Sequence, residues 1–143
     1  VIPHAGKILL VQRKKDCGIG LWALPGGHVN PNETFKDASI RELREETKIK
    51  DSKGSIPAGR LGSYITDSLF IDTPNRSLRG RVVTEAFRYQ LPDKDTYTVR
   101  AGDDAKAAKW CDINKLDPRT MFEDHAFIID RMLGTSICRQ VTF

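Results

Sequence analysis

Glu42, Glu45 and Glu46 are the residues whose types and spacing most directly suggest chemistry. If residues 34–47 are helical, positions three and four apart lie on one face, with Cβ atoms about 6 Å apart. Carboxylates this close repel one another and destabilise a bare helix, so a bound cation is expected to compensate. Oxygen ligands suit Mg²⁺ or Mn²⁺, and proteins usually hold Mg²⁺ with a few carboxylates, waters and substrate phosphates.

The same pattern has a simpler explanation, a solvated helix whose glutamates pair with Arg41, Arg44 and Lys48. Taken alone, charged residues at helical spacing usually mean this. The neighbouring residues change the balance, because Gly27 lies six residues before Glu33 and an arginine directly precedes the first glutamate of the cluster. The segment as a whole therefore favours a metal site.

The order of residues from Gly27 to Ile49 resembles the Nudix box. In that motif a Gly is followed after five residues by Glu, and seven more lead to Arg-Glu, an aliphatic residue, any residue, and Glu-Glu. Lys48 is the one departure, since the family usually has Gly there, and it affects the expected helix end rather than the chemistry. The matching residues are Gly27, Glu33, Arg41, Glu42, Leu43, Glu45, Glu46 and Ile49.

This resemblance implies roles for the residues of the box. Glu42, Glu45 and Glu46 would ligate the metal, with Glu45 and Glu46 central, and Glu33 would help through water or structure. The arginine would hold a glutamate in position. Backbone at the two glycines would approach the metal, which the absence of a side chain permits. Which carboxylate takes the proton from water stays open. The implied catalytic residues are Glu45, Glu46, Glu42, Arg41 and Glu33, and the implied metal-binding residues are Gly26, Gly27, Glu42, Glu45 and Glu46.

The similarity extends beyond the box. Residues 22–30 resemble the entry to the box in ADP-ribose pyrophosphatases, and residues 72–87, 102–105 and 122–125 resemble the Nudix domain of bifunctional nicotinamide-mononucleotide adenylyltransferase/Nudix proteins. This implies hydrolysis of ADP-ribose to AMP and ribose 5-phosphate. It also implies an adenylyltransferase domain upstream, with which the missing initiator Met is consistent. A homodimer is common among ADP-ribose-cleaving relatives, although no apolar stripe here requires one.

Three arginines and two aromatic residues are candidates for substrate contact. Arg76, Arg79 and Arg81 can bind a diphosphate in bidentate fashion, or they belong to a basic surface loop. Trp22 and Phe70 can stack on adenine, although aromatic residues more often belong to the core. Weaker candidates, each with a structural alternative, are Tyr89 for stacking, Glu85 as a ligand or base, His125 as a proton carrier, and Asp103 and Asp104 near the site.

Three other functions remain open. A housecleaning hydrolase of oxidised nucleoside triphosphates or dinucleoside polyphosphates would use the same metal helix. A regulator that senses ADP-ribose without cutting it would resemble the arginine-rich middle section, but such proteins typically carry a degraded box. A pure interaction module would lack all divalent-dependent activity. The complete set of glutamates favours the enzyme.

The rest of the chain must position these residues. A buried strand is expected at residues 7–13, a helix at 34–47 capped by Thr34 and ended near Lys48, a loop at 51–60 and a second helix at 124–133 ended by Gly134. Further strands are expected at 61–70, 81–91 and 106–111. Without regular βαβ alternation, these elements predict an α+β fold with a mixed sheet between helices, which agrees with the Nudix fold.

Length and composition set wide limits. The 143 residues suit one domain, taken as residues 1–143. The three cysteines lack disulfide or zinc spacing, and neither a signal peptide nor a membrane-spanning run is visible, so a cytoplasmic location is expected. The net charge of +4 favours anionic ligands by steering, or it reflects a lysine-rich solvated surface, and no long basic run suggests nucleic acid.

Overall fold

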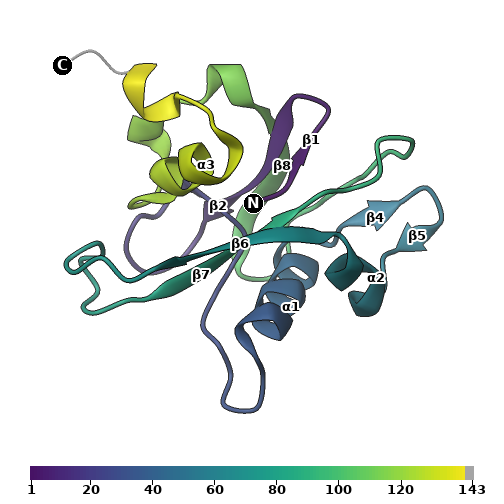
Figure 1. Ribbon diagram of the computed structural model, residues 1–143, viewed down its shortest axis with the longest axis horizontal. Coiled ribbons are helices and arrows are strands. Elements are labelled where there is room, and N and C mark those ends of the chain that lie inside the picture. Colours follow the sequence, from purple (N-terminus) through teal and green to yellow (C-terminus); the bar gives the residue numbers. More distant parts are fainter. Residues whose placement is uncertain (141–143) are drawn as a thin grey trace.

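The central strand of the largest sheet is β2 (Lys7–Arg13), as its apolar run predicts. The computed structural model, which describes residues 1–140, pairs it antiparallel with β8 (Ala105–Asp112) along one edge. Along the other edge, β2 pairs with β1 (Pro3–His4) and with β3 (Trp22–Ala23). Residues 8–11 are all buried, so both faces of this strand are covered (Figure 1).

A second, separate sheet is the antiparallel hairpin of β6 (Ile65–Ile71) and β7 (Thr84–Tyr89). The nitrogen of Val1 donates to the carbonyl of Phe87, and the Val1 carbonyl accepts from the amide of residue 89, so the start of the chain lies along β7. The predictions of strands at 61–70 and 81–91 are therefore confirmed, although the bounds differ. The first begins four residues later than expected, at Ile65, and the second is shorter.

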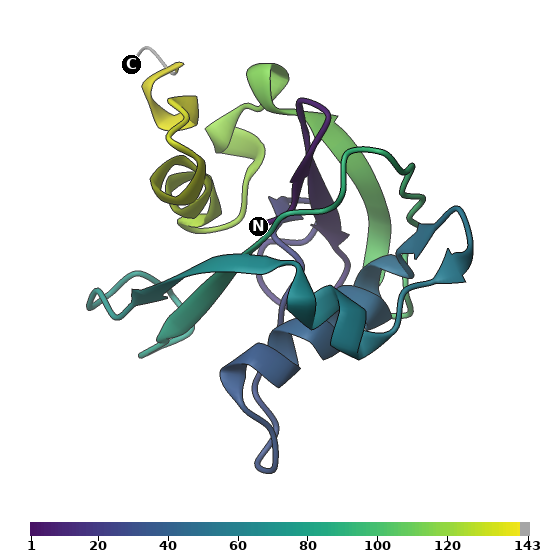
Figure 2. The same ribbon diagram turned by 45° about the vertical axis from the view of Figure 1, so that its right-hand side comes forward.

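Two helices cover opposite sides of these strands. Figures 1 and 2 both show the β6–β7 hairpin between α1 (Phe35–Thr47) and α3 (His125–Leu133). Alternation along the strands separates two halves of the core, since successive side chains point to opposite faces. The half beside α1 includes Leu9, Phe87, Tyr89, Ile40 and Leu43, and the half beside α3 includes Ile8, Leu10, Ala86, Ile128 and Ile129.

The ends of α1 follow from its flanking residues. The hydroxyl of Thr34 accepts a hydrogen bond from the Asp37 amide at 3.1 Å, which is the predicted N-cap. Lys48 ends the helix in the left-handed conformation, with φ of 47°, and its amide donates to the Arg44 carbonyl at 3.1 Å. A lysine therefore performs the C-cap role usually given to Gly, and the helix ends where the motif requires.

The prediction of a loop at residues 51–60 is wrong. The segment contains a two-residue hairpin, β4 (Lys50–Asp51) with β5 (Gly54–Ser55), and the start of helix α2 (Ala58–Ser63). Glycines at positions 59 and 62 lower intrinsic helix propensity and conceal this helix from a pattern analysis. Leu61 is completely buried in the half of the core beside α1. This burial stabilises a helix that intrinsic propensity alone does not favour.

The remaining chain completes the layer around α3. After β8 come three short 3₁₀ helices, Ile113–Lys115, Pro118–Thr120 and, beyond α3, Ile137–Gln140. Gly134 ends α3 with φ of 68°, as predicted. Antiparallel sheets between helices, with one isolated parallel bridge between Trp22 and Met121, confirm the predicted α+β class. Within residues 1–140, no helix is long and apolar enough to cross a bilayer.

Candidate active site

Arg41, on α1, makes hydrogen bonds to several neighbouring groups and so joins them in one polar network. Its guanidinium donates to both carboxylate oxygens of Glu33, at 3.0 and 2.6 Å, and to the carbonyl of His28 at 3.0 Å. The same group donates to Glu42 at 2.7 Å and to Glu45 at 3.3 Å. Charge-assisted bonds of this kind fix geometry as well as charge. One arginine thus ties the loop before the helix to two glutamates on it.

Glu33 links the loop to itself as well as to the helix. Its carboxylate accepts a hydrogen bond from the Asn30 amide at 2.8 Å in addition to those from Arg41. The Arg41 bond, followed by the Asn30 bond, lowers the pKa of Glu33. Glu33 is therefore ionised at neutral pH. Its hydrogen bonds to Asn30 and Arg41 hold the loop before α1 in its conformation.

Glu46 differs from its neighbours because no cation pairs with it among residues 1–140. Its carboxylate accepts from the amide of Gly26 at 3.2 Å. Burial raises the pKa of Glu46 to about 8, and the nearby carboxylates of Glu42 and Asp104 add to the rise. A carboxylate that is desolvated and next to another carboxylate, yet unpaired, has the environment expected where a cation belongs.

Gly27 permits the close approach of Glu42 to the loop. A Cβ added at Gly27 would lie 2.4 Å from Oε1 of Glu42, whereas one added at Gly26 would meet nothing within 4 Å. The second glycine of the pair therefore leaves room for the Glu42 carboxylate in its observed position, and the first has no such contact. Gly26 instead contributes its amide to Glu46.

Glu45 stands apart from this pair. Its side chain is 59% exposed and turned toward Arg41. Within the described part of the chain, no three acidic, His or Cys side chains are placed to hold a metal ion together. The arrangement fits a divalent cation held first by Glu42 and Glu46, because Mg²⁺ commonly takes one or two carboxylates and completes its shell with water and phosphate.

The side chain of Arg76 is engaged within the protein. Its side chain is only 5% exposed and makes two bonds of 2.8 Å to the carboxylate of Asp124 and one of 2.6 Å to the Thr84 hydroxyl. Its donors join the β6–β7 loop to the start of α3, so they are not free for a phosphate. The sequence offered no signal of this pairing, because the partners are 48 residues apart.

The other two arginines are more accessible. Arg79 bonds to Glu123 at 3.3 Å, and its guanidinium lies 5.3 Å from the centre of the Phe122 ring. Arg81 is exposed, and no hydrogen bond or ion pair of its side chain occurs within residues 1–140. Of the three, Arg81 is therefore the one with an unengaged guanidinium.

The two aromatic candidates also differ. Phe70, on β6, is 55% exposed and opposite Glu85 of β7 in the strand register. Trp22 packs against the core half beside α3, and the Lys109 ammonium lies 4.5 Å from its ring centre. Phe70 therefore offers an open ring face, and Trp22 is mainly a packing residue. Tyr89 is buried and shares a 2.8 Å hydrogen bond with Ser39, which makes it a core residue too.

Two supports of the site were not predicted from the sequence. The amide of Gly102 donates to the Glu46 carbonyl at 2.9 Å, and that of Arg100 to the Thr47 carbonyl at 2.8 Å, so this loop closes the end of α1. His125 accepts at Nδ1 from the Leu24 amide at 3.0 Å, which anchors the chain just before the two glycines. Both contacts join residues far apart in sequence and have no local signature.

The weaker candidates in the loop before β8 lie at the surface. Asp103 and Asp104 are exposed, and the second pairs with Lys15 at 3.2 Å. They precede β8, which begins at residue 105, as the structural alternative expected, but the Asp104 carboxylate is also near enough to Glu46 to raise its pKa.

Comparison with known proteins identifies several relatives. An ADP-ribose pyrophosphatase of Methanocaldococcus jannaschii is 36% identical over 132 residues, which are 92% of this chain and 69% of that protein. The mitochondrial ADP-ribose pyrophosphatase of Rattus norvegicus is 31% identical over 143 residues, 89% of this chain and 40% of that one.

A solved structure agrees with these sequences. The bifunctional NMN adenylyltransferase/ADP ribose pyrophosphatase of Francisella tularensis, complexed with AMP and a manganese ion, matches 94% of this chain and 39% of its own with a TM-score of 0.81 and 35% identity. The chain thus spans about two fifths of both the rat and the Francisella proteins. A model of the NUDIX domain matches residues 1–132. This protein therefore belongs to the Nudix hydrolase family.

Proposed function

We propose that this Nudix hydrolase cleaves the pyrophosphate of ADP-ribose to AMP and ribose 5-phosphate with Mg²⁺ or Mn²⁺. The observation that carries the proposal is the pair of carboxylates on α1, Glu42, which Arg41 holds close to Gly27, and Glu46, which accepts from the Gly26 amide. The names of the relatives in Methanocaldococcus, rat and Francisella support the choice of substrate.

The residues of the chain divide the work. Arg41 orients Glu42 toward the loop, and Glu33 keeps Arg41 and the loop in register. Glu46 is the half-buried carboxylate whose pKa is raised by burial to about 8, and a cation beside it would favour its ionised form. The bound cation would neutralise phosphate oxygens and make water more acidic. Glu45, exposed and adjacent, completes the group of glutamates that we assign to the site.

Recognition of the nucleotide is assigned to the hairpin side of the molecule. Phe70 offers an exposed ring on which adenine can stack, and Arg81 offers a free guanidinium for the diphosphate. Arg79 can serve the diphosphate only by weakening its bond to Glu123. Arg76 is left out of the substrate contacts, because it is buried against Asp124.

A panel of substrates tests the proposal. ADP-ribose, CTP, 8-oxo-dGTP and a dinucleoside polyphosphate would be compared by kcat/KM with Mg²⁺, with Mn²⁺ and with EDTA. We expect ADP-ribose to have the highest kcat/KM and EDTA to abolish turnover. A higher kcat/KM for a triphosphate would replace the substrate and keep the family. Binding of ADP-ribose without any turnover would favour a sensor and contradict the proposal.

A further inference from the structure

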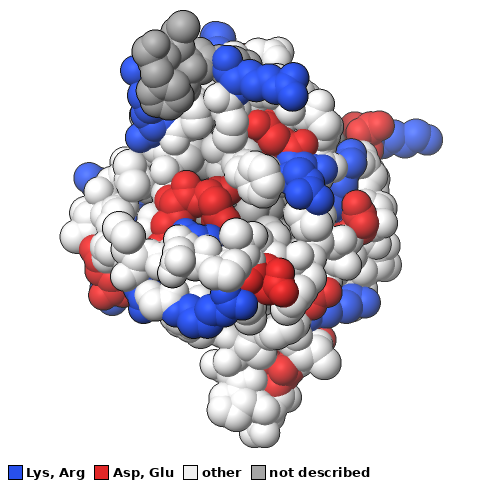
Figure 3. Space-filling model, turned by 60° about the vertical axis from the view of Figure 1, so that its left-hand side comes forward, with Lys and Arg blue, Asp and Glu red and all other residues white. Residues whose placement is uncertain are grey.

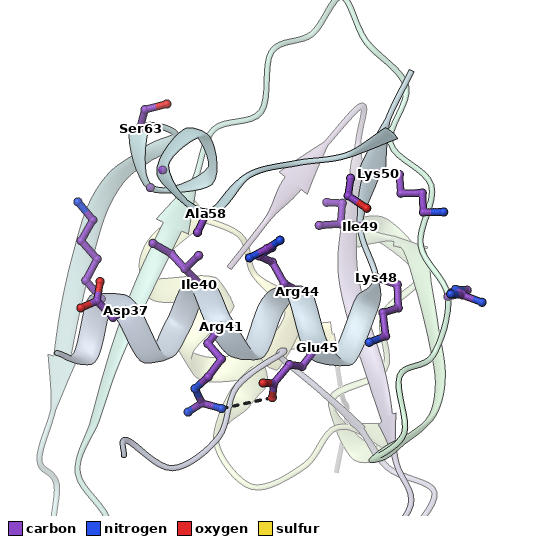
Figure 4. Close-up of a pocket in the computed structure, with 15 residues that line it drawn as sticks. Asp37, Ile40, Arg41, Arg44, Glu45, Lys48, Ile49, Lys50, Ala58 and Ser63 are labelled. Carbon is purple, nitrogen blue, oxygen red and sulfur yellow. Dashed lines mark hydrogen bonds and ion pairs between the residues drawn. The ribbon is translucent and has the colours of Figure 1, made fainter. Parts of the chain in front are cut away.

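A groove with a volume of about 940 Å³ lies between α1, α2 and the β4–β5 hairpin. Figure 4 shows it along the side of α1, with Ile40 and Ile49 toward the core and Ala58 on the opposite wall. Gly62 lets α2 lie close to α1, since a Cβ there would be 3.3 Å from Ile40 Cδ1. The volume is within the range of sites that hold small molecules, about 300–1,000 Å³.

The groove contains the whole net charge of the chain. Six of its lining residues are Lys or Arg and two are Asp or Glu, an excess of four positive charges. The chain has 23 Lys and Arg against 19 Asp and Glu, so 17 of each remain elsewhere and cancel. The face in Figure 3 shows both signs intermingled. The C-terminal end of the α1 dipole contributes only about half a unit of negative charge, so it offsets little of this positive excess.

Most of these cations have no carboxylate partner. Within residues 1–140, the ion pairs of the groove involve Arg41 alone, which bonds to Glu45 on its lower side (Figure 4). The side chains of the other five make no ion pair in the described part of the chain, whereas four of the nine arginines outside the groove do. These five are Lys36, Arg44, Lys48, Lys50 and Arg100.

The chemistry of the lining indicates what the groove takes. Unpaired cations around one concavity concentrate positive potential and attract anions with several charges. Ser55 adds a hydroxyl donor, whereas the Ser63 hydroxyl already donates to the Arg60 carbonyl at 2.6 Å. No aromatic side chain lines the groove, so it lacks the stacking surface on which single-stranded nucleic acid or a base would bind. The features suit a short phosphate chain better than a base.

We propose that this groove is a second, metal-independent binding site for a linear oligophosphate, either free or as the phosphate tail of a nucleotide. It lies on the other side of Arg41 from Glu42, and it shares only Arg41 and Glu45 with the proposed catalytic network. Arg44, Lys50 and Arg100 would bind phosphate oxygens by charge-assisted hydrogen bonds.

Titration calorimetry with inorganic tripolyphosphate and, separately, ATP would test this site in EDTA, which removes divalent cations. The test variant is Arg44→Gln with Lys50→Gln. The matched control is Lys94→Gln with Lys115→Gln, two exposed lysines outside the groove, which changes the net charge equally. Thermal unfolding of each variant checks the fold. Because neither double variant touches the glutamates, ADP-ribose turnover reports separately on the proposed function.

We expect tripolyphosphate to bind without metal, with Kd raised about tenfold or more in the groove variant and nearly unchanged in the control. Comparable affinity for ATP means that the phosphate tail is the bound part. An equal rise in the Kd of tripolyphosphate in both double variants would mean that the anion is attracted by the overall charge and would overturn the proposal. Absence of binding in EDTA, or binding that appears only with Mg²⁺ and disappears in Glu46→Gln, would also overturn it.

Discussion

Arg41 contacts four groups at once, Glu33, Glu42, Glu45 and the carbonyl of His28. No other residue could replace a planar fork of donors in this position, because Lys offers a single point of charge. At the scale of single residues, hydrogen-bond geometry therefore determines the arrangement of the site. Substitutions that keep the charge or nearly the size of a side chain should lower activity while the protein still folds.

Arg41→Lys should lower kcat/KM for ADP-ribose by about 10- to 100-fold, the usual cost of losing a residue that orients ligands. The charge is retained, so the loss would come from released Glu42 and Glu33. Steady-state kinetics with circular dichroism melting would measure it. An unchanged kcat/KM would mean that Arg41 has no orienting role.

Gly27→Ala and Gly26→Ala form a matched pair. The first places a Cβ 2.4 Å from Glu42 Oε1 and the second meets nothing within 4 Å. Glu42 is the end of a flexible side chain, so it can move aside at little cost in stability. We expect Gly27→Ala to lower kcat by about 10- to 100-fold and Gly26→Ala to leave it nearly unchanged. Equal kinetics for the two variants would contradict the contact.

At the scale of elements, α1 is the unit that positions the site, and both of its ends are fastened. Thr34 caps its start, Lys48 caps its end in the left-handed conformation, and the loop at residues 100–102 closes the last carbonyls. The first cap could be predicted from local sequence. The closing loop could not, because it depends on the packing of a segment more than 50 residues away along the chain.

Gly102→Ala should destabilise the fold by roughly 1–3 kcal/mol, because an added Cβ would lie 1.9 Å from the carbonyl oxygen of Glu45, which is backbone and cannot turn aside. The loop would have to move away from α1 and weaken its bond to the Glu46 carbonyl. Urea unfolding would measure the free energy.

Gly59→Ala in α2 is the control for that substitution, since its Cβ meets nothing within 4 Å. A helical Gly→Ala change there should be neutral or stabilise by up to about 1 kcal/mol. If Gly102→Ala unfolded at the same urea concentration as the native chain, the close approach of loop and helix would be refuted.

Prediction from sequence succeeded where the pattern is local. The glutamate spacing, the Thr34 cap and the apolar run of β2 predicted α1 and the central strand correctly. It failed for α2, whose two glycines hide a helix stabilised by burial of Leu61. It also gave no sign that Arg76 is occupied by Asp124, because only the folded chain brings them together.

At the scale of the whole molecule, the strands divide the core into one half beside α1 and another beside α3. A contact between residues on the two sides of the strands helps to hold the site in place. His125, at the start of α3, accepts a hydrogen bond from Leu24 in the segment that enters the box. α3 and α1 cover opposite sides of the strands, so this bond connects α3 to the segment that leads into the two glycines before α1. The ring must be neutral at Nδ1 to accept it.

Burial lowers the pKa of His125 to about 4, against the opposing charges of Asp124 and Glu123 and with help from Arg76 and Arg13. The unfolded chain binds a proton near pH 6.5, before the folded chain does. This contribution to stability is therefore complete above pH 6.5 and is lost as pH falls toward 4, by at most about 3 kcal/mol.

His125→Asn tests this pH dependence. An asparagine cannot be protonated in this range and its carbonyl can accept the Leu24 amide, so its unfolding free energy should fall less steeply between pH 6.5 and 4. Urea unfolding of both chains at several pH values would compare the slopes. Parallel slopes would exclude His125 as the cause.

The most direct test of the central claim is the release of AMP from ADP-ribose in Mg²⁺ or Mn²⁺, followed by chromatography, for the native chain and for Glu46→Gln. The account predicts AMP and ribose 5-phosphate in equal amounts from the native chain and almost none from the variant, with both chains folded. Equal AMP release by the two, or none from a folded native chain that turns over another nucleotide, would contradict it.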